Sequence, residues 1–330
     1  MRLLTRSDIA RAISMPEAVE AAGRAYAQLS MGHAEVPPRI VISSEKYAGV
    51  TLFMPGALTG EDAMAIKIVS VHDRNPERGL PLIHGLVIVI DPATGRPLAA
   101  MEGGHLTALR TGAGSGAATD LLARGDAKTA AIFGAGIQAR TQLLAVAAVR
   151  EIRRFWIYSP RLDRVEAMIQ ELRPQLDASI ELRAAESPSR AVRDAEIICA
   201  ATTSATPVFS GEDLKPGAHV NAVGSFRPHI REVDALTLQR ASKIVVDSME
   251  SAMAEAGDIL MAIDEGAIPA SKIHGEIGEI GAGLKPGRED DQEITFFKSV
   301  GNAAQDVATA HAIYRRSLEE NLGIDIDLEA

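Results

Sequence analysis

The sequence predicts an α/β protein in which a doubly wound parallel sheet is joined to a second, α+β domain. From about residue 118 to about residue 260, short apolar runs alternate with helical stretches, which is typical of a parallel sheet with helices on both faces. Before residue 118, several β-like runs follow one another without helices between them. That arrangement favours an antiparallel or mixed sheet.

The composition is that of a globular protein and excludes several classes. Of the 330 residues, 46% are hydrophobic and 24% are charged, and the net charge of −10 argues against a nucleic-acid or anionic-membrane binder. No apolar run approaches the roughly 20 residues that a membrane helix needs. The N-terminus, MRLLTRSDIARAI, lacks the apolar core of a secretion signal. With one cysteine, Cys199, a reducing cytoplasm is the expected location.

The first domain begins with a helix and continues with strands. Ser14-Met15-Pro16-Glu17 fits a capping box, which predicts a helix to about Ser30 that ends at Gly32. The β-like runs that follow are RIVIS, GVTLFM, AMAIKIVSV and LIHGLVIVID. The segment VIVIDPATGRPLAAM predicts a hairpin that turns at Asp91–Gly95.

The parallel sheet is predicted from six apolar runs. They are KTAAIF, RRFWIY, SIELRA, EIICAA, HVNAVG and KIVVDS. Most of the last forty residues, from DQEITFFKSVG onward, are expected to form one long helix that packs back on the first domain.

A glycine-rich segment follows the first of these runs. Gly134, Gly136 and Ala139 match the pattern G-x-G-x-x-A, with an apolar strand before it and a helix after it. In a Rossmann domain, residues of this kind permit a tight turn, a close approach of the backbone to a pyrophosphate, and close helix–strand packing. A structural turn is the alternative. The flanking elements favour dinucleotide binding.

The end of the next strand indicates which dinucleotide is preferred. An NAD enzyme usually places Asp or Glu there to bind the adenine ribose, but this chain has Ser159 and Arg161, with Arg164 nearby. Arg161 could pair with the 2′-phosphate of NADPH. Alternatively both arginines begin a solvated helix, and Asp163 weakens the case for a phosphate. We expect NADPH to be preferred, with NADH possible.

Three cations stand in apolar or small-residue surroundings. Lys67 would share a strand face with Ala65, Val69 and Val71, where lost hydration lowers the pKa of a lysine and suits it to act as an acid, a base or a carboxylate anchor. An edge position that lets the side chain reach water is the alternative. Arg110 precedes a stretch of Gly, Ala and Thr, and Arg39 opens the run RIVIS; both could bind an anion.

Other reactive residue types have little support. Cys199 lies among small apolar neighbours and is expected to be a buried strand residue, although a catalytic thiol is conceivable. No metal-binding motif is present, so no metal is expected. Among the histidines, His229 follows a predicted strand at the end where such sheets place their active-site loops.

Four segments together resemble the ornithine cyclodeaminase/μ-crystallin family. They are IKIVSV through RTGAGS, AAIFGAGIQAR, NAVGSFRPHIRE and FFKSVG, in that order. The resemblance covers essentially the whole chain and implies a homodimer. It assigns residues 1–117 and 303–330 to a substrate-binding and dimerisation domain, and residues 118–302 to a Rossmann domain that binds NAD(P).

The resemblance also implies the site residues. Arg39, Lys67 and Arg110 match positions that hold a substrate carboxylate, with Lys67 near the reacting centre and Met54 beside the substrate. The expected cofactor-contacting residues are Arg110, Thr111, Gly134, Gly136, Ile137, Gln138, Ser159, Arg161, Thr202, Val223, Gly224 and Ser225.

One departure from the family pattern distinguishes between its reactions. Cyclodeaminases and alanine dehydrogenases of the family carry an Asp where this chain has Phe226, and a phenyl ring transfers no proton. Met54 likewise offers no carboxylate to a distal amine. We therefore expect an NAD(P)H-dependent reductase of a cyclic ketimine carboxylate, Δ1-pyrroline-2-carboxylate or Δ1-piperideine-2-carboxylate, giving L-proline or L-pipecolate.

Two other functions stay open. The first is an NAD-dependent ornithine cyclodeaminase that releases proline and ammonia. The second is a non-catalytic protein that binds NADPH or a small ligand.

Overall fold

The computed structural model describes residues 1–328, which form two compact units. Unit 1 contains Met1–Arg110 and the chain from Asn302, and unit 2 contains Thr111–Gly301. The chain therefore passes from one unit to the other twice. The first passage lies within helix α3 (Gly103–Leu122), and the second lies between a strand of unit 2 and a helix of unit 1.

Unit 1 is built on a mixed sheet. Its strands are β1 (Arg2–Leu4), β2 (Ala34–Glu35), β3 (Ile40–Ser44), β4 (Gly49–Leu58), β5 (Ala63–His72), β6 (Ile83–Ile90), β7 (Pro97–Glu102) and β16 (Ile324–Asp325). The order is β16-β1-β7-β6-β5-β4-β2, and β3 also pairs with β4. Strands β3 to β7 pair antiparallel through consecutive hairpins, whereas β1 runs parallel to β7.

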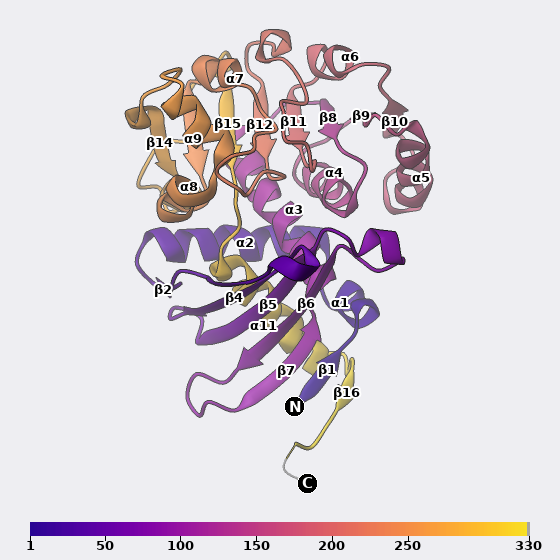
Figure 1. Cartoon of the computed structure of the whole chain (residues 1–330), viewed down its shortest axis with the longest axis vertical. Helices are drawn as coiled ribbons and strands as arrows, with labels where there is room; N and C mark the ends of the chain where they lie inside the picture. The colour runs from indigo at the N-terminus through magenta and orange to yellow at the C-terminus, as the bar shows by residue number, and fades with distance from the viewer. Residues whose placement is uncertain (329–330) are drawn as a thin grey trace. The chain divides into compact units, whose positions relative to one another are not determined.

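Among the described residues, three α-helices belong wholly to unit 1. They are α1 (Arg6–Ala12), α2 (Met15–Ser30) and α11 (Ala303–Glu319). Helix α2 starts with the expected capping box, in which Ser14 and Glu17 bond to each other's backbone N–H groups. Helix α11 packs on the sheet across β4, β5 and β6 and also against α2 (Figure 1). The sheet is thus covered by an element that lies more than 200 residues further along the chain.

Unit 2 is a doubly wound parallel sheet. Its strands are β8 (Thr129–Phe133), β9 (Arg154–Tyr158), β10 (Glu181–Ala184), β11 (Ile197–Ala200), β12 (His219–Ala222), β13 (Lys243–Val246), β14 (Ile273–Glu276) and β15 (Thr295–Lys298). They are ordered β10-β9-β8-β11-β12-β15-β13-β14, and every pairing is parallel. The two sheets confirm the predicted fold class.

Helices cover both faces of the parallel sheet (Figure 1). They are α4 (Ile137–Val149), α5 (Leu162–Leu172), α6 (Pro188–Arg193), α7 (Ala235–Arg240), α8 (Met249–Glu255), α9 (Gly257–Asp264) and α10 (Ile277–Gly281). Ala130 and Ile132 pack in the core beneath α4 and α5, whereas Ala131 and Phe133 pack in the core beneath α6 to α9. The alternation follows from the two-residue period of a strand.

The C-terminal part of unit 2 differs from the prediction. The alternation of strands and helices does not stop near residue 260, because β14 and β15 extend the sheet. Strand β15 (Thr295–Lys298) lies inside the segment expected to begin a long helix, and it is inserted between β12 and β13. Helix α11 itself is shorter than expected and ends at Glu319. No helix among the described residues is long and apolar enough to cross a membrane.

Candidate functional site

Lys67 occupies the middle of an apolar row in unit 1. It pairs in register with Met54 on β4 and with Val87 on β6, and Val87 pairs with Met101 on β7. All four side chains are buried, and that of Lys67 is 1% exposed. Because β5 is an inner strand, the alternative interpretation of Lys67 as an edge residue that reaches water is wrong.

A carboxylate from helix α11 meets this lysine. Lys67 Nζ lies 2.7 Å from Asp306 Oδ2, and Arg110 Nε lies 3.0 Å from Asp306 Oδ1. The Asp306 side chain is 1% exposed and that of Arg110 is 7% exposed. The three groups form a buried triad that we call the Lys67–Asp306–Arg110 cluster. Buried charges of this kind persist when each has a partner.

The first turn of α11 fixes this cluster from one side. Asn302 caps the helix, and Gln305 completes a capping box with it. Gln305 Oε1 accepts a hydrogen bond from Arg110 Nη1 at 3.1 Å, and Gln305 Nε2 donates to the Tyr26 hydroxyl at 2.6 Å. The arginine is therefore oriented by two consecutive residues of one helix.

The environment lowers the pKa of Lys67 from its ordinary value to about 7. Burial is the largest cause, and the positive charges of Arg110 and Arg39 act in the same direction, whereas Asp306 opposes them. A lysine of this kind gains and loses a proton near neutral pH and can serve as an acid or a base.

The residues expected to bind the substrate differ in burial. Lys67, Arg110 and Met54 are buried, while Arg39, just before β3, is half-buried. Asp306 was not among the expected residues. The sequence held a signal for it, since one acidic residue stands among small apolar ones in NAAQDVATA, on a helix expected to pack inward.

In unit 2, the glycine-rich segment forms the turn from β8 to α4. Gly134 has φ +109°, and a Cβ atom there would lie 2.5 Å from the carbonyl oxygen of Ala201. Gly136 is the N-cap of α4 and supplies no side-chain cap, and a Cβ there would meet no described atom within 4 Å. The first-turn N–H groups of α4 thus lack a side-chain acceptor, which fits the pyrophosphate of a dinucleotide.

The turn after β9 carries Ser159 and Arg161. The Arg161 side chain is 61% exposed and pairs with Asp163, with Nη2 2.8 Å from Oδ2. Ser159 Oγ accepts a hydrogen bond from the backbone N–H of Arg161. The guanidinium that was expected to meet a 2′-phosphate thus already has a carboxylate partner, as the position of Asp163 in the sequence suggested.

The loops after β11 and β12 are joined by a buried glutamate that the sequence prediction missed. Glu232 Oε2 accepts hydrogen bonds from Thr202 N at 2.9 Å and Thr202 Oγ1 at 3.1 Å. Glu232 Oε1 accepts a hydrogen bond from Gly224 N. Burial raises the pKa of Glu232. One carboxylate therefore connects two loops that carry expected cofactor residues.

A second buried ion pair, between Asp258 and Lys298, lies beside the backbone of Glu232. Asp258 Oδ1 accepts hydrogen bonds from the backbone N–H groups of Glu232 and Val233, and Lys298 Nζ lies 2.5 Å from Asp258 Oδ2. Both side chains of this pair are fully buried. Lys298 on β15 and Asp258 on α9 therefore hold the backbone at Glu232 in place.

The remaining expected residues of unit 2 differ in burial. Thr111, Val223 and Ser225 are buried, and Ile137 is exposed at the start of α4. Gln138 also lies in the first turn of α4. Phe226 is half-buried and packs at the margin of the core, with the Arg227 guanidinium 5.6 Å from its ring centre.

The two other candidate residues differ in burial. Burial raises the pKa of the Cys199 thiol to about 12, so Cys199 is a core residue. His229 is exposed. Among residues 1–328, no group of three or more His, Cys, Asp or Glu side chains is arranged to hold a metal ion.

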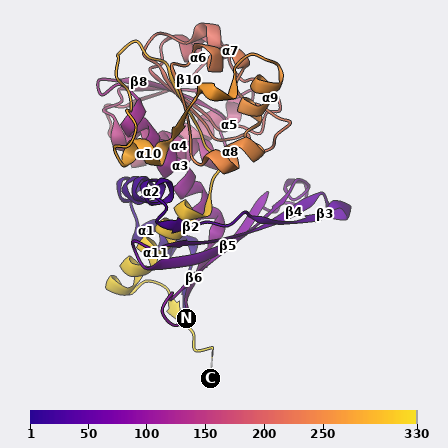
Figure 2. The ribbon, with the colours of Figure 1, turned by 90° about the vertical axis from the view of Figure 1, so that its left-hand side faces the viewer.

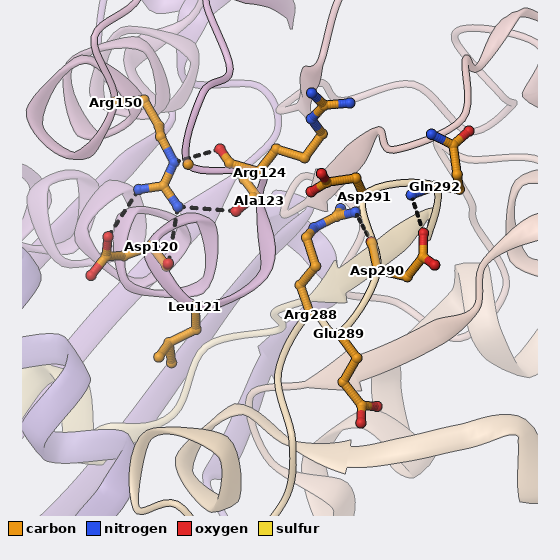
Figure 3. Close-up of a pocket in the computed structure, with 11 residues that line it drawn as sticks. Asp120, Leu121, Ala123, Arg124, Arg150, Arg288, Glu289, Asp290, Asp291 and Gln292 are labelled. Atoms are coloured by element: carbon orange, nitrogen blue, oxygen red, sulfur yellow. Dashed lines mark hydrogen bonds and ion pairs between the residues drawn. The ribbon is translucent and has the colours of Figure 1, made fainter.

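A cavity of about 640 Å³ in unit 2 is rich in charge but is not suited to an anionic ligand. Arg150 reaches Asp120 and the carbonyl oxygens of Thr119 and Ala123 (Figure 3). Arg288 is bound in the same way by carbonyl oxygens that include those of Leu122 and Glu293. These guanidinium groups connect segments of backbone.

Comparison with known proteins identifies the family. The model of the ornithine cyclodeaminase/mu-crystallin family matches residues 1–321. A Delta(1)-pyrroline-2-carboxylate reductase from Bacillus cereus is 39% identical over 99% of this chain and 100% of its own length. The structure of the Thermococcus litoralis Delta(1)-pyrroline-2-carboxylate reductase in complex with NADH and L-proline is 43% identical, with a TM-score of 0.95, and covers 99% of this chain and 100% of its own.

A third similar protein is an archaeal alanine dehydrogenase, solved as a dimer with bound NAD. It is 35% identical, has a TM-score of 0.92 and covers 99% of both chains. Each of these similarities extends over both units, including the segments that carry Lys67, the glycine-rich turn and Asp306. The chain therefore belongs to the ornithine cyclodeaminase/mu-crystallin family.

Proposed function

We propose that the protein is an NAD(P)H-dependent imine reductase that converts Δ1-pyrroline-2-carboxylate into L-proline and accepts Δ1-piperideine-2-carboxylate as well. The chief support is Lys67, a buried lysine beside Arg110 in an otherwise apolar row. A compact, apolar ring with one carboxylate matches that chemistry. The full-length similarity to two Δ1-pyrroline-2-carboxylate reductases, one of them bound to NADH and L-proline, points the same way.

We assign the substrate carboxylate to Arg39, Lys67 and Arg110, and the contact with the ring to Met54. Arginine and lysine bind carboxylates through charge-assisted hydrogen bonds. Lys67 is also the proposed proton donor to the imine nitrogen, because its pKa of about 7 suits proton transfer near neutral pH. Unit 1, with residues 1–117 and 303–330 as the expected boundaries, would then be the substrate-binding domain.

The cofactor is assigned to unit 2, for which residues 118–302 are the expected boundaries. Gly134, Gly136, Ile137 and Gln138 would hold the pyrophosphate at the start of α4, and Ser159 and Arg161 would meet the adenosine. The loops with Thr202, Val223, Gly224 and Ser225 would hold the nicotinamide end, together with Arg110 and Thr111. When bound, the reduced nicotinamide supplies the hydride that the imine carbon accepts.

NADPH is the preferred cofactor in this proposal, and NADH is also accepted. The support is the absence of a carboxylate at the end of β9 and the presence of Ser159 and Arg161. Because Arg161 already pairs with Asp163, the 2′-phosphate must compete with a carboxylate for the guanidinium. We therefore expect a modest preference.

A homodimer formed through unit 1 is the proposed assembly. Strand β3 lies at the edge of the sheet, and Ile40, Val41 and Ile42 are all more than half exposed. Figure 2 shows β3 and the adjoining end of β4 extending beyond α2 and α11. An exposed apolar edge strand offers both unpaired backbone groups and apolar surface to another chain.

The decisive experiment follows the oxidation of reduced nicotinamide by absorbance. The purified protein is mixed with NADPH or NADH and with either cyclic imine, and the product is identified by chiral chromatography. Rapid oxidation that yields L-proline, faster with NADPH, is the expected result. Oxidation at equal rates with both cofactors would remove the NADPH preference and leave the reductase function intact.

The same preparation tests the two other functions. Release of proline and ammonia from L-ornithine with NAD, in the absence of imine reduction, would identify a cyclodeaminase. Tight binding of NADPH without turnover of any imine or amino acid would identify a binding protein. Alanine dehydrogenase activity, which the family also includes, is tested by adding pyruvate and ammonia. We expect this preparation to oxidise little NADH with them, because Phe226 replaces the usual Asp.

A further inference from the structure

We propose that Asp306 is the positioning residue of the reductase site: it orients Lys67 and Arg110 and preserves the positive charge of Lys67 until the imine nitrogen takes the proton. This inference rests on the proposed function and assigns a role to a carboxylate outside the residues expected to bind substrate or cofactor. Asp306 acts through Lys67, so we do not place it among the groups that touch the substrate.

The geometry supports a positioning role. The two Asp306 oxygens are divided between the two cations, with Oδ2 2.7 Å from Lys67 Nζ and Oδ1 3.0 Å from Arg110 Nε. Since all three side chains are almost completely buried, the two contacts are shielded from bulk solvent, which strengthens them. A shift of the carboxylate would move both cations together.

The carboxylate is fixed by its helix. Asp306 lies in the first turn of α11, where Asn302 and Gln305 form the capping box and Gln305 also holds Arg110. Through its other end, Gln305 bonds to Tyr26 on α2. The helix, the arginine and the carboxylate are therefore parts of one buried network within unit 1.

The charges around Lys67 make the carboxylate necessary. Strands β4 and β6 present Met54 and Val87, which carry no charge. Arg110 on α3 and Arg39 before β3 both lower the pKa of Lys67, as burial does, and Asp306 on α11 raises it. Without the carboxylate, the pKa of Lys67 would fall further, and Lys67 would keep its proton over a narrower range of pH.

The proton step balances with one lysine proton. The imine carbon gains a hydride, the π electrons of the C=N bond become a lone pair on nitrogen, and that nitrogen takes a proton from the Lys67 ammonium. The dihydronicotinamide is oxidised by two electrons, and Lys67 is left as a neutral amine. A proton from water restores the ammonium before the next turnover, at a position that Asp306 makes favourable.

The test compares pH profiles of kcat/KM for the wild-type enzyme and Asp306→Asn. Activity that needs a protonated Lys67 falls as the pH rises through the lysine's pKa. Removing the carboxylate lowers that pKa, so the basic limb should move to lower pH by about one unit or more. The expected loss is then about 10-fold or greater at pH about 8 and smaller at lower pH. Asp325→Asn, which removes a carboxylate paired with Arg2 in the same unit, is the matched control and should leave the profile unchanged.

The outcomes distinguish a positioning role of Asp306 from a purely structural one. Parallel profiles, with the same loss at every pH, would overturn the proposal and leave Asp306 a purely structural residue. If Asp306→Asn does not fold, Asp306→Glu and Asp306→Ser are compared: the charged variant should keep the basic limb and the neutral one should lose it. Failure of every neutral variant to fold, or coincident limbs, would likewise overturn the proposal. An inactive wild-type enzyme would instead contradict the proposed function.

Discussion

The ammonium of Lys67 is buried in surroundings that are otherwise apolar along its row of the sheet. An unpaired charge in such a place costs several kcal/mol, and the pairing with Asp306 offsets much of this cost. A buried ion pair adds little to stability on balance, and lysines with a strongly perturbed pKa cluster at functional sites. The chemistry that we propose for unit 1 is accordingly centred on one side chain.

Replacing Lys67 by Ala should abolish turnover and spare cofactor binding. General acid catalysis contributes about 10²- to 10⁴-fold, so a loss of at least about 100-fold in kcat is expected. The fold should survive, because Arg110 still neutralises Asp306. Steady-state rates with the imine give the first value, and titration of NADH fluorescence gives the second. Near-normal turnover would remove Lys67 from the mechanism.

The sequence identified Lys67 but not Asp306, and the reason is physical. The lysine interrupts a local period of two, which can be seen within nine residues of β5. Its partner lies 239 positions later on a helix, and no local pattern records which helix face meets which strand. Glu232 was missed for a similar reason, since an isolated Glu in a loop gives no sign that two other loops bond to it.

The loops at the ends of β11 and β12 form one element of the candidate cofactor site. Both depend on hydrogen bonds to Glu232, and the turn after β8 depends on a glycine that faces the chain at Ala201. Three consecutive strands of the sheet order, β8, β11 and β12, therefore end in segments fixed to one another or packed closely together. The two predictions that follow test this arrangement.

Replacing Glu232 by Gln should weaken cofactor binding. The amide keeps the size of the side chain but turns one oxygen into a donor, which then faces the N–H group of Thr202 or Gly224. We expect the Kd for NADH to rise by about 10-fold, which corresponds to about 1.4 kcal/mol. Fluorescence titration measures the Kd. The exposed Glu166→Gln on α5 is the control, and an unchanged Kd in both variants would contradict a role for Glu232.

Replacing Gly134 by Ala should destabilise unit 2. The backbone has φ +109°, which disfavours any residue with a Cβ, and the new atom would lie 2.5 Å from the Ala201 carbonyl oxygen. The free energy of unfolding should fall by about 1–3 kcal/mol, with loss of NADH binding. Urea denaturation provides the comparison. Gly125→Ala, where the added Cβ meets no described atom within 4 Å, should be tolerated, and equal effects would contradict this explanation.

For the complete protein, the apolar edge at β3 predicts a dimer in solution. Ile42 is 54% exposed, so Ile42→Asp adds a charge to the proposed interface without disturbing the core. Light scattering should find a dimer for the wild-type protein and a monomer for the variant. Leu284→Asp, at a leucine of unit 2 that is 64% exposed, is the control and should remain dimeric. A wild-type monomer would contradict the proposal.

The sequence predicted those elements that are determined by residues close together in the chain. The hairpin at Asp91–Gly95, the helix capped by Ser14 and the glycine-rich turn after β8 are local patterns, and the structure confirms each. The order of strands in the parallel sheet was not predicted. Strand β15 has four residues and pairs with β12 and β13, which lie well before it in the chain. A strand this short can be identified only from the strands with which it pairs, and its own residues do not show which strands those are.

The position of β15 also has a consequence for how the chain can fold during synthesis. Strands β13 and β14 connect with the rest of the parallel sheet through β15, which is synthesised after every other strand of that sheet. The sheet of unit 1 likewise stays uncovered until α11, which follows a few residues later, has been synthesised. Neither unit can therefore be completed before the segment from β15 to α11 has been synthesised. A nascent chain stalled shortly before Thr295 would hold two unfinished sheets, which makes it a substrate for chaperones.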